Sequence, residues 1–187
     1  DYGNKFGEPL IQGFTRSFDL RLENGERWGF LKPIMFTAGI GQIDDRHTDK
    51  KDALKGMIIV QIGGPAYRVG FGGGAASSMM QGENEAKLDF NAVQRGDAEM
   101  EQKMNRVIRA CNEMGDLSLI DVIHDQGAGG PANVLKELVE HAGGRVEIRN
   151  IRVGDPTMSV LEIYVAEYQE RVGLLISPEN IARFQAI

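Results

Sequence analysis

The feature that most constrains the fold is a short apolar run that leads directly into a glycine-rich stretch. Residues 57–64 read MIIVQIGG, an almost continuous apolar run bounded by glycines, which predicts a buried β-strand. Six glycines then fall within the sixteen residues 63–78, GGPAYRVGFGGGAASS. Because glycine has no Cβ and tolerates unusual backbone angles, this stretch can bring backbone N–H groups against an anion. Glycine content alone suits a phosphate loop and a long turn packed against a helix equally.

The glycine-rich stretch matches neither of two familiar nucleotide loops. It lacks the lysine followed by serine or threonine of a P-loop, and its glycines do not have the spacing of the dinucleotide fingerprint. Arg68 lies within the stretch and favours the phosphate interpretation, since a guanidinium pairs well with phosphate oxygens.

Composition indicates a globular chain with an acidic balance. With 42% apolar residues among 187, the chain can bury a sizeable core. The net charge of -6, without a basic stripe, gives no electrostatic reason to bind nucleic acid. No apolar run approaches the roughly 18 residues of a membrane span. The single cysteine, Cys111, excludes an intrachain disulfide and is expected to be a buried thiol. We therefore expect a cytoplasmic protein without nucleic-acid or membrane partners.

The N-terminal part of the sequence predicts a strand pair. Residues 10–22 alternate between apolar and polar side chains, Asn-Gly-Glu at 24–26 is a hairpin signal, and residues 28–40 supply a second strand. The polar stretch 41–56 follows, and we place a domain boundary near residue 50.

The remainder of the sequence predicts a mixed α+β fold. Residues 98–114 carry apolar side chains at three- and four-residue spacing, which predicts a helix, with Asp97 as a candidate N-cap. Residues 117–125 resemble a strand and residues 132–144 a helix that ends in glycines. Further strands or short helices are expected at 146–153, 161–170 and 171–177.

The motif HDQGAGG at residues 124–130 is the clearest candidate for chemistry. It follows an apolar run, so Asp125 is expected at the C-terminal end of a strand, where ligands of α/β proteins commonly bind. A carboxylate there can hold magnesium, which prefers oxygen ligands, or can simply cap a turn. The neighbouring His124 is more often structural than catalytic in such a position.

Two other polar segments have open interpretations. In DFNAVQRGD, Gln94 can hydrogen-bond a polar substrate, while Asp97 can equally be only a helix cap. In AEYQER, Glu167 and Gln169 lie on one side of an extended segment, opposite Tyr168. They can face a ligand or form a solvated edge.

Several strings, in this order, resemble a known family. YGNKFGEP, KPIMFTAGIG, GGPAYRVGFGGGAASS, LDFNAVQRGDAEMEQKM, IHDQGAGG and GDPTMSVLEIYVAEYQER are similar to the phosphoribosylformylglycinamidine synthase family in its large single-chain form, over nearly the whole chain. The resemblance implies an α+β, aminoimidazole ribonucleotide synthetase-like fold. Residues 1–49 would be the C-terminal part of an N-terminal sheet domain, and residues 50–187 a C-terminal α/β domain that is incomplete at its end.

The resemblance also implies an activity. The family is an ATP-dependent carbon–nitrogen ligase of purine biosynthesis. It converts formylglycinamide ribonucleotide, glutamine and ATP into formylglycinamidine ribonucleotide, glutamate, ADP and phosphate, with Mg²⁺ and ATP/ADP as cofactors. The expected partners are the substrate, the remaining synthase half and a glutaminase domain. The chain is expected to be an internal fragment that is inactive alone.

Site residues follow from the same resemblance, residue by residue, and none of them is expected to be a covalent catalyst. The nucleotide-contacting loop would be Asn4, Lys5, Phe6 and Gly7, and the magnesium ligand would be Asp125. The substrate-contacting residues would be Gln94, Glu167, Tyr168 and Gln169, with Gly72, Gly73 and Gly74 in a substrate-side loop. Tyr168 stands where the smaller form of the family has a serine.

Two alternatives remain at this point. The chain can be a structural module that holds an auxiliary ADP through residues 4–7, or a related selenophosphate synthetase-like or hydrogenase-maturation protein. The long strings AVQRGDAEMEQKM and AEYQER argue against the second. Cys111 lies in synthase-like sequence and is not expected to be a glutaminase nucleophile.

Overall fold

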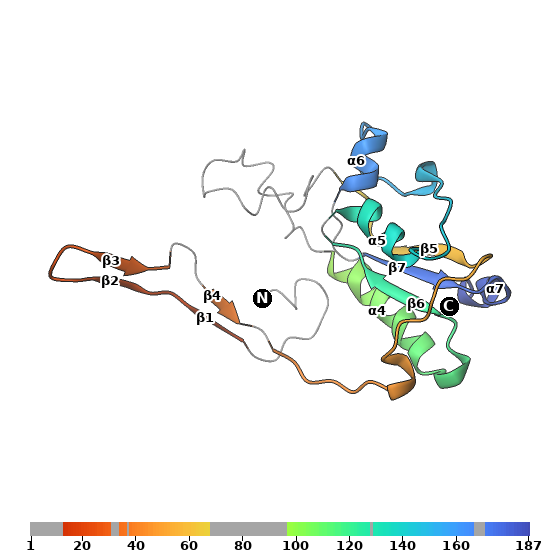
Figure 1. Cartoon of the computed structure of the whole chain (residues 1–187), viewed down its shortest axis with the longest axis horizontal. Coiled ribbons are helices and arrows are strands. Elements are labelled where there is room, and N and C mark those ends of the chain that lie inside the picture. The colour runs from red at the N-terminus through yellow and green to blue at the C-terminus, as the bar shows by residue number, and fades with distance from the viewer. Residues whose placement is uncertain (1–12, 31–33, 37, 68–96, 128, 167–170) are drawn as a thin grey trace.

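The chain forms a long two-stranded ribbon followed by a body of a small sheet between helices (Figure 1). The computed structural model describes residues 13–30, 34–36, 38–67, 97–127, 129–166 and 171–187.

The ribbon consists of two pairs of short antiparallel strands. Strand β1 (Phe14–Arg16) pairs with β4 (Ile34–Phe36), and β2 (Asp19–Arg21) pairs with β3 (Arg27–Gly29). The turn is closed by a hydrogen bond from the Leu22 amide to the Glu26 carbonyl, 2.9 Å. The predicted hairpin is thus confirmed, although each expected strand is divided into two short ones.

The body is built on a three-stranded sheet with the order β5–β7–β6. Strands β5 (Ile58–Gly63) and β6 (Val122–Asp125) both run antiparallel to the central β7 (Arg171–Ile176). All six residues of β7 are buried.

The strand predicted at residues 57–64 exists, but it is not the buried one. Within the described sheet β5 pairs only with β7, and Ile58 is 42% exposed. Burial belongs to β7 instead, because β7 has a neighbour on each side and helices over both faces.

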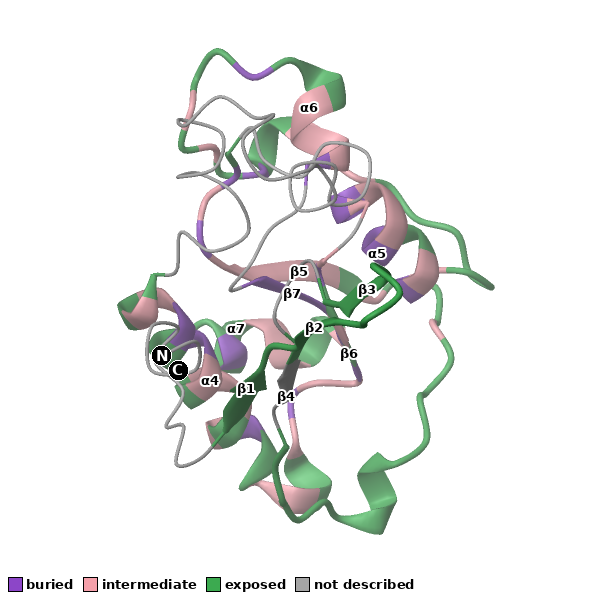
Figure 2. Ribbon diagram, turned by 90° about the vertical axis from the view of Figure 1, so that its left-hand side faces the viewer, coloured by how far each residue is buried: buried purple, intermediate pink, exposed green. Residues whose placement is uncertain are grey.

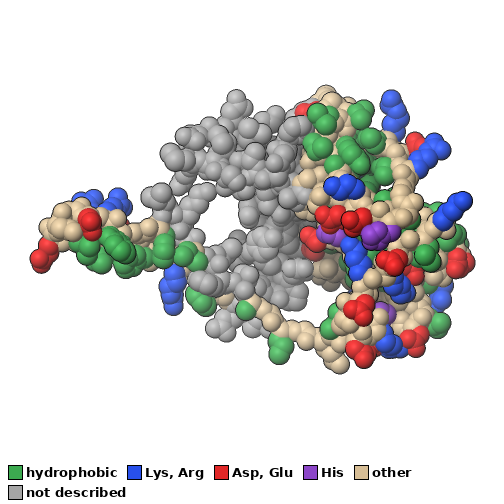
Figure 3. Space-filling view, in the orientation of Figure 1, with side chains coloured by type: hydrophobic (Ala, Val, Ile, Leu, Met, Phe, Trp, Pro, Cys, Tyr) green, Lys and Arg blue, Asp and Glu red, His purple; other side chains and the backbone are tan. Residues whose placement is uncertain are grey.

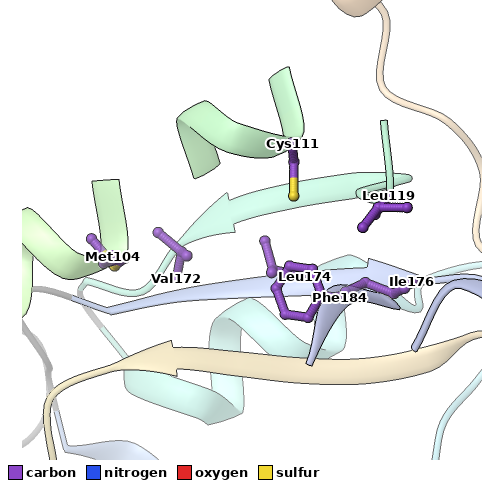
Figure 4. Packing of buried hydrophobic residues seen from close by; sticks show 7 residues of the cluster. All are labelled: Met104, Cys111, Leu119, Val172, Leu174, Ile176 and Phe184. Atoms are coloured by element: carbon purple, nitrogen blue, oxygen red, sulfur yellow. The ribbon is translucent and has the colours of Figure 1, made fainter. Parts of the chain in front are cut away.

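Helices α4 (Ala98–Asn112) and α7 (Ile181–Phe184) cover one face of the sheet. As predicted, Asp97 caps α4, and its carboxylate accepts a hydrogen bond from the Met100 amide, 3.0 Å. The side chains of this core point toward one another between helix and strands (Figure 4); they are Met104, Cys111, Leu119, Val172, Leu174, Ile176 and Phe184.

Cys111 has no solvent exposure and forms no disulfide, so the expectation of a buried thiol is confirmed. Burial raises the pKa of the thiol, which keeps it protonated and unreactive.

Helix α5 (Gly130–Leu138) covers the opposite face. Its buried residues Val134, Leu135 and Leu138 pack with Val122 and Leu175. The helix lies close to the sheet over Gly173, where an added Cβ would stand 2.8 Å from a Leu138 methyl and 3.0 Å from a Val134 methyl. Figure 2 shows buried residues on the helices beside the sheet, whereas residues 13–30 of the ribbon are all exposed.

A third cluster packs beside α6 (Val160–Val165), whose N-terminus has a capping box between Ser159 and Glu162. The cluster contains Ala66, Ile151, Met158 and Ala166. Four 3₁₀ turns complete the described secondary structure: η1 (Asp45–His47), η2 (Gly115–Leu117), η3 (Ile148–Asn150) and η4 (Pro178–Asn180). No helix in the described residues is long and apolar enough to cross a membrane.

The segment between the ribbon and β5 follows the surface of the body. Arg46 pairs with Asp44 and Asp116, and the Lys51 ammonium lies 3.4 Å from the Asp121 carboxylate. Arg46, its two aspartate partners and Lys51 are exposed to solvent, which screens these pairs, so they contribute little to stability. The domain boundary near residue 50 stays a prediction.

Candidate functional site

Three sequence segments singled out above meet at one end of the sheet. Strands β5 and β6 end there and β7 begins there, because both run antiparallel to β7. In register, Gly63 lies opposite Arg171, and Asp125 lies opposite Val172. The start of the glycine-rich stretch, the HDQGAGG motif and the residue that follows AEYQE are therefore neighbours in space.

The chain that leaves β5 is held on a fixed path up to Tyr67. The Ala66 amide donates to the Arg152 carbonyl, 2.8 Å, and the Gly154 amide donates to the Ala66 carbonyl, 2.7 Å. A parallel bridge between Ala66 and Val153 joins the same two segments. The glycine-rich stretch thus starts from a defined position at the site.

Asp125 is the last residue of β6, as the sequence predicted, and its side chain is 90% exposed. The neighbouring His124 is held from both sides. Its Nδ1 lies 2.8 Å from the Asp125 carbonyl oxygen, and its Nε2 lies 2.6 Å from the Glu137 carboxylate. Asn133 also donates to Glu137, 3.0 Å. His124 therefore joins the end of β6 to α5, in agreement with the structural role expected for it.

The Asp125 carboxylate fits a magnesium ligand in chemistry and in access. Its side chain is 90% exposed, and the neighbouring His124 lies with Nδ1 3.5 Å from Oδ1. No group of three or more His, Cys, Asp and Glu side chains suited to a metal occurs in the described residues. One carboxylate is compatible with Mg²⁺, because this ion often combines one or two carboxylates with water and substrate phosphates.

The HDQGAGG motif also contacts Ala166, the first residue of the AEYQER segment. Gly130 has φ +54°, and a Cβ added there would overlap the Ala166 carbonyl oxygen and lie 3.0 Å from its carbonyl carbon. The main chains of the two motifs touch at this point. Only glycine fits, both because of the left-handed conformation and because of the approaching backbone.

Two buried polar residues at the site, Gln126 and Arg171, were not predicted from the sequence. Gln126 is 1% exposed, and its Oε1 accepts a hydrogen bond from Gln61 Nε2, 2.5 Å. Arg171 is 5% exposed and donates to the carbonyls of Gly64 and Arg152. A signal existed: Arg171 is a charged residue that opens an otherwise apolar run, RVGLLI.

Most of the expected ligand-contacting residues lie outside the described residues. These are Asn4, Lys5, Phe6, Gly7, Gly72, Gly73, Gly74, Gln94, Glu167, Tyr168 and Gln169. Asp125 is thus the one predicted site residue among the described residues. The ligand contacts assigned to the other eleven residues stay predictions.

The fold and the site define a class of protein. Residues 55–187 match the family described as "AIR synthase related protein, C-terminal domain", so the chain belongs to this family. Its α+β fold, expected from the sequence, is confirmed.

Named relatives narrow the resemblance to one enzyme. The chain is 61% identical over all its 187 residues to a probable phosphoribosylformylglycinamidine synthase, chloroplastic/mitochondrial, of Arabidopsis thaliana. It is 55% identical over 181 residues, 96% of its length, to the phosphoribosylformylglycinamidine synthase of Homo sapiens. The chain spans only 13% and 14% of the length of these two relatives.

Solved structures agree with this resemblance. The Thermotoga maritima protein described as "PurL complexed with FGAR" aligns with 98% of the chain, at 26% identity and a TM-score of 0.66. The same protein described as "PurL complexed with ATP" aligns with 74%, at 26% identity and a TM-score of 0.55. The chain covers 29% and 20% of those proteins.

Proposed function

We propose that this chain supplies part of the substrate cleft of a phosphoribosylformylglycinamidine synthase. In the proposed reaction, ATP activates the formyl-amide oxygen of formylglycinamide ribonucleotide, and ammonia from glutamine then displaces the phosphate. The observation that favours this function most is the convergence of the β5 exit, the β6 end and the β7 start at one edge of the sheet. The solved relatives named for FGAR and ATP support it.

Each predicted group of site residues has a proposed task. Residues 72–74, 94 and 167–169 bind the ribonucleotide, and residues 4–7 contact the nucleotide. Asp125 holds Mg²⁺, which would neutralise charge on the phosphates. Chemistry of this kind depends on positioning and on electrostatic stabilisation, and needs no covalent nucleophile from this chain. His124 and Glu137 keep the end of β6 against α5, so that the carboxylate is presented from a fixed backbone.

The full-length polypeptide is expected to form the amidine only when formylglycinamide ribonucleotide, ATP, Mg²⁺ and glutamine or ammonia are all present. Mass spectrometry of the ribonucleotide, together with phosphate and ADP assays, measures this. Removal of divalent ions by EDTA should abolish product, and added Mg²⁺ should restore it. ATP turnover without amidine formation would contradict the proposed function.

The ribbon offers a surface for the rest of such a polypeptide. Its side chains alternate, with an apolar face on one side and the Asp19–Arg27 ion pair on the other. Figure 3 shows hydrophobic side chains gathered along one side of the ribbon. The exposed apolar residues are Phe14, Phe18, Leu20, Leu22, Trp28, Phe30 and Ile34. Because an isolated two-stranded hairpin is only marginally stable, we propose that another segment of the longer polypeptide covers this face.

If this face is covered, Trp28→Ala in the full-length polypeptide should lower its stability by about 3 kcal/mol, the usual cost of truncating a buried tryptophan. Trp28 is 62% exposed in the described chain, so an uncovered side chain would give a change within about 0.5 kcal/mol. Thermal unfolding and hydrogen exchange of residues 13–30 measure the effect. Arg21→Ala, on β2 but on the opposite face, is the matched control.

The cellular compartment is also a proposal. We place the reaction in the cytoplasm, while the name of the Arabidopsis relative assigns that protein to chloroplasts or mitochondria. Fractionation of cells with an antibody to the full-length polypeptide tests the assignment.

A further inference from the structure

Arg171 occupies the junction of the three converging segments. It is the first residue of β7 and directly follows residues 167–170 in the sequence. Its side chain is almost completely buried. A guanidinium is costly to remove from water unless its N–H groups find acceptors, so the contacts that it makes indicate what it is there to hold.

The side chain of Arg171 fixes the exit of β5. Its Nε donates to the Gly64 carbonyl, 2.8 Å, and one terminal nitrogen donates to the same oxygen. That nitrogen also lies 3.4 Å from the Arg152 carbonyl, which accepts the Ala66 amide as well. The planar guanidinium can reach both carbonyls at once, which an ammonium cannot do with the same geometry. The chain that continues into the glycine-rich stretch is therefore held by Arg171.

The main chain of Arg171 fixes the HDQGAGG motif. Its carbonyl accepts the Gln126 amide, 3.0 Å, one residue beyond Asp125. The buried Gln126 side chain in turn reaches Gln61 on β5. The end of β6 is thus tied to β7 through the backbone and to β5 through an amide pair.

We propose that Arg171 is a positioning residue for the synthase reaction. Through its side chain it holds the start of the glycine-rich stretch at Gly64, and through its carbonyl it holds the HDQGAGG motif at Gln126; in the sequence it directly follows the proposed substrate segment. It does not touch the reacting atoms. This inference rests on the proposed function, because the three segments matter together only if they bind one substrate. A purely structural role of Arg171 would give a different result. Substitution of Arg171 would then reduce the amount of folded protein and leave the kinetic constants of the folded fraction unchanged.

Arg171→Met and Arg171→Lys in the full-length polypeptide test the proposal. Methionine keeps the buried volume but has no hydrogen-bond donors. Lysine keeps the positive charge but loses the planar pair of N–H donors that bind the Gly64 carbonyl. For Arg171→Met we expect kcat/KM for formylglycinamide ribonucleotide to fall on the order of 100-fold, mainly through KM, since displacements of about 1 Å can cost that much. Lysine should recover part of the loss. Arg145→Met removes an exposed arginine of the same domain and is the control, with unchanged constants expected.

A second readout separates this inference from the proposed function. Hydrogen exchange should accelerate together at residues 64–67 and 124–127 in both Arg171 variants, and not in Arg145→Met. Unchanged KM values and unchanged exchange in a folded variant would overturn the inference. If Arg171→Met does not fold, the KM and the hydrogen exchange of Arg171→Lys test the inference instead. Wild-type protein that forms no amidine would overturn the proposed function, while coupled exchange would still establish the positioning by Arg171.

Discussion

Substitution of Gly130 by alanine is expected to destabilise the body of the protein by about 4 kcal/mol, near the upper end of single-residue effects. The reason is a contact between backbones. A Cβ at this position would overlap the Ala166 carbonyl oxygen and lie 3.1 Å from the Val165 carbonyl carbon. Neither atom can move away by a rotamer change, so α5 or the chain after α6 must shift. A positive φ adds strain for any residue with a Cβ.

The matched control is Gly143→Ala. Gly143 also has a positive φ, +68°, but no atom lies within 4 Å of the position that its Cβ would take. This variant should lose only the cost of the left-handed conformation, about 1 kcal/mol. Urea titration of both variants measures the difference. Equal losses for the two would show that the close approach of Gly130 to Ala166 is not a tight contact.

Gly130→Ala should also impair ligand binding in the fraction that remains folded. Ala166 directly precedes the proposed substrate segment, so a shift of its carbonyl moves the start of that segment. Gly143 lies in the turn after α5 and away from this contact, and its variant should bind as the wild type does.

Asp125→Asn is expected to lower amidine turnover on the order of 100-fold, the scale seen when one group that stabilises a transition state electrostatically is removed. An asparagine keeps the size of the side chain and one oxygen but removes the negative charge that Mg²⁺ prefers. The Asp125 side chain is highly exposed and takes no part in the core, so the melting temperature should change little. Steady-state turnover at increasing Mg²⁺ measures the effect, and the variant should require more Mg²⁺ for half-maximal rate.

Asp116→Asn provides the control for charge alone. Asp116 is an exposed aspartate that pairs with Arg46 and lies in the turn after α4. It precedes the start of β6, whereas Asp125 is at the end of that strand. Its variant should retain full turnover. Normal turnover of Asp125→Asn would instead assign Asp125 to the turn and remove the metal site from this position.

Features that depend on near neighbours in the sequence could be predicted. The ribbon, the Asp97 cap of α4 and the end of β6 at Asp125 were all found in advance, because alternation, capping and turn signals act over a few residues. One local signal was overlooked: Ser159 and Glu162 have the spacing of a capping box, which marks α6 in a stretch that was also compatible with a strand.

The expected ligand-binding residues illustrate a different limit. Their assignment came from the resemblance of long strings and not from spacing, since a glycine-rich stretch or a Glu-Tyr-Gln segment suits a turn as well as a ligand. The family match over residues 55–187 supports the resemblance as a whole. It does not assign the individual side chains, which stay proposals.

The sequence by itself determined most of the helices and strands, the acidic net charge, the buried thiol and, through its motifs, the family. Only the tertiary structure decided which strand is central, why Gly130 must be glycine and what Arg171 holds. The reason is physical: burial of β7 depends on neighbours on both sides, and Arg171 bonds a carbonyl 107 residues away in the chain. Contacts of that range arise from the packing of the whole sheet, so no local pattern of residues specifies them.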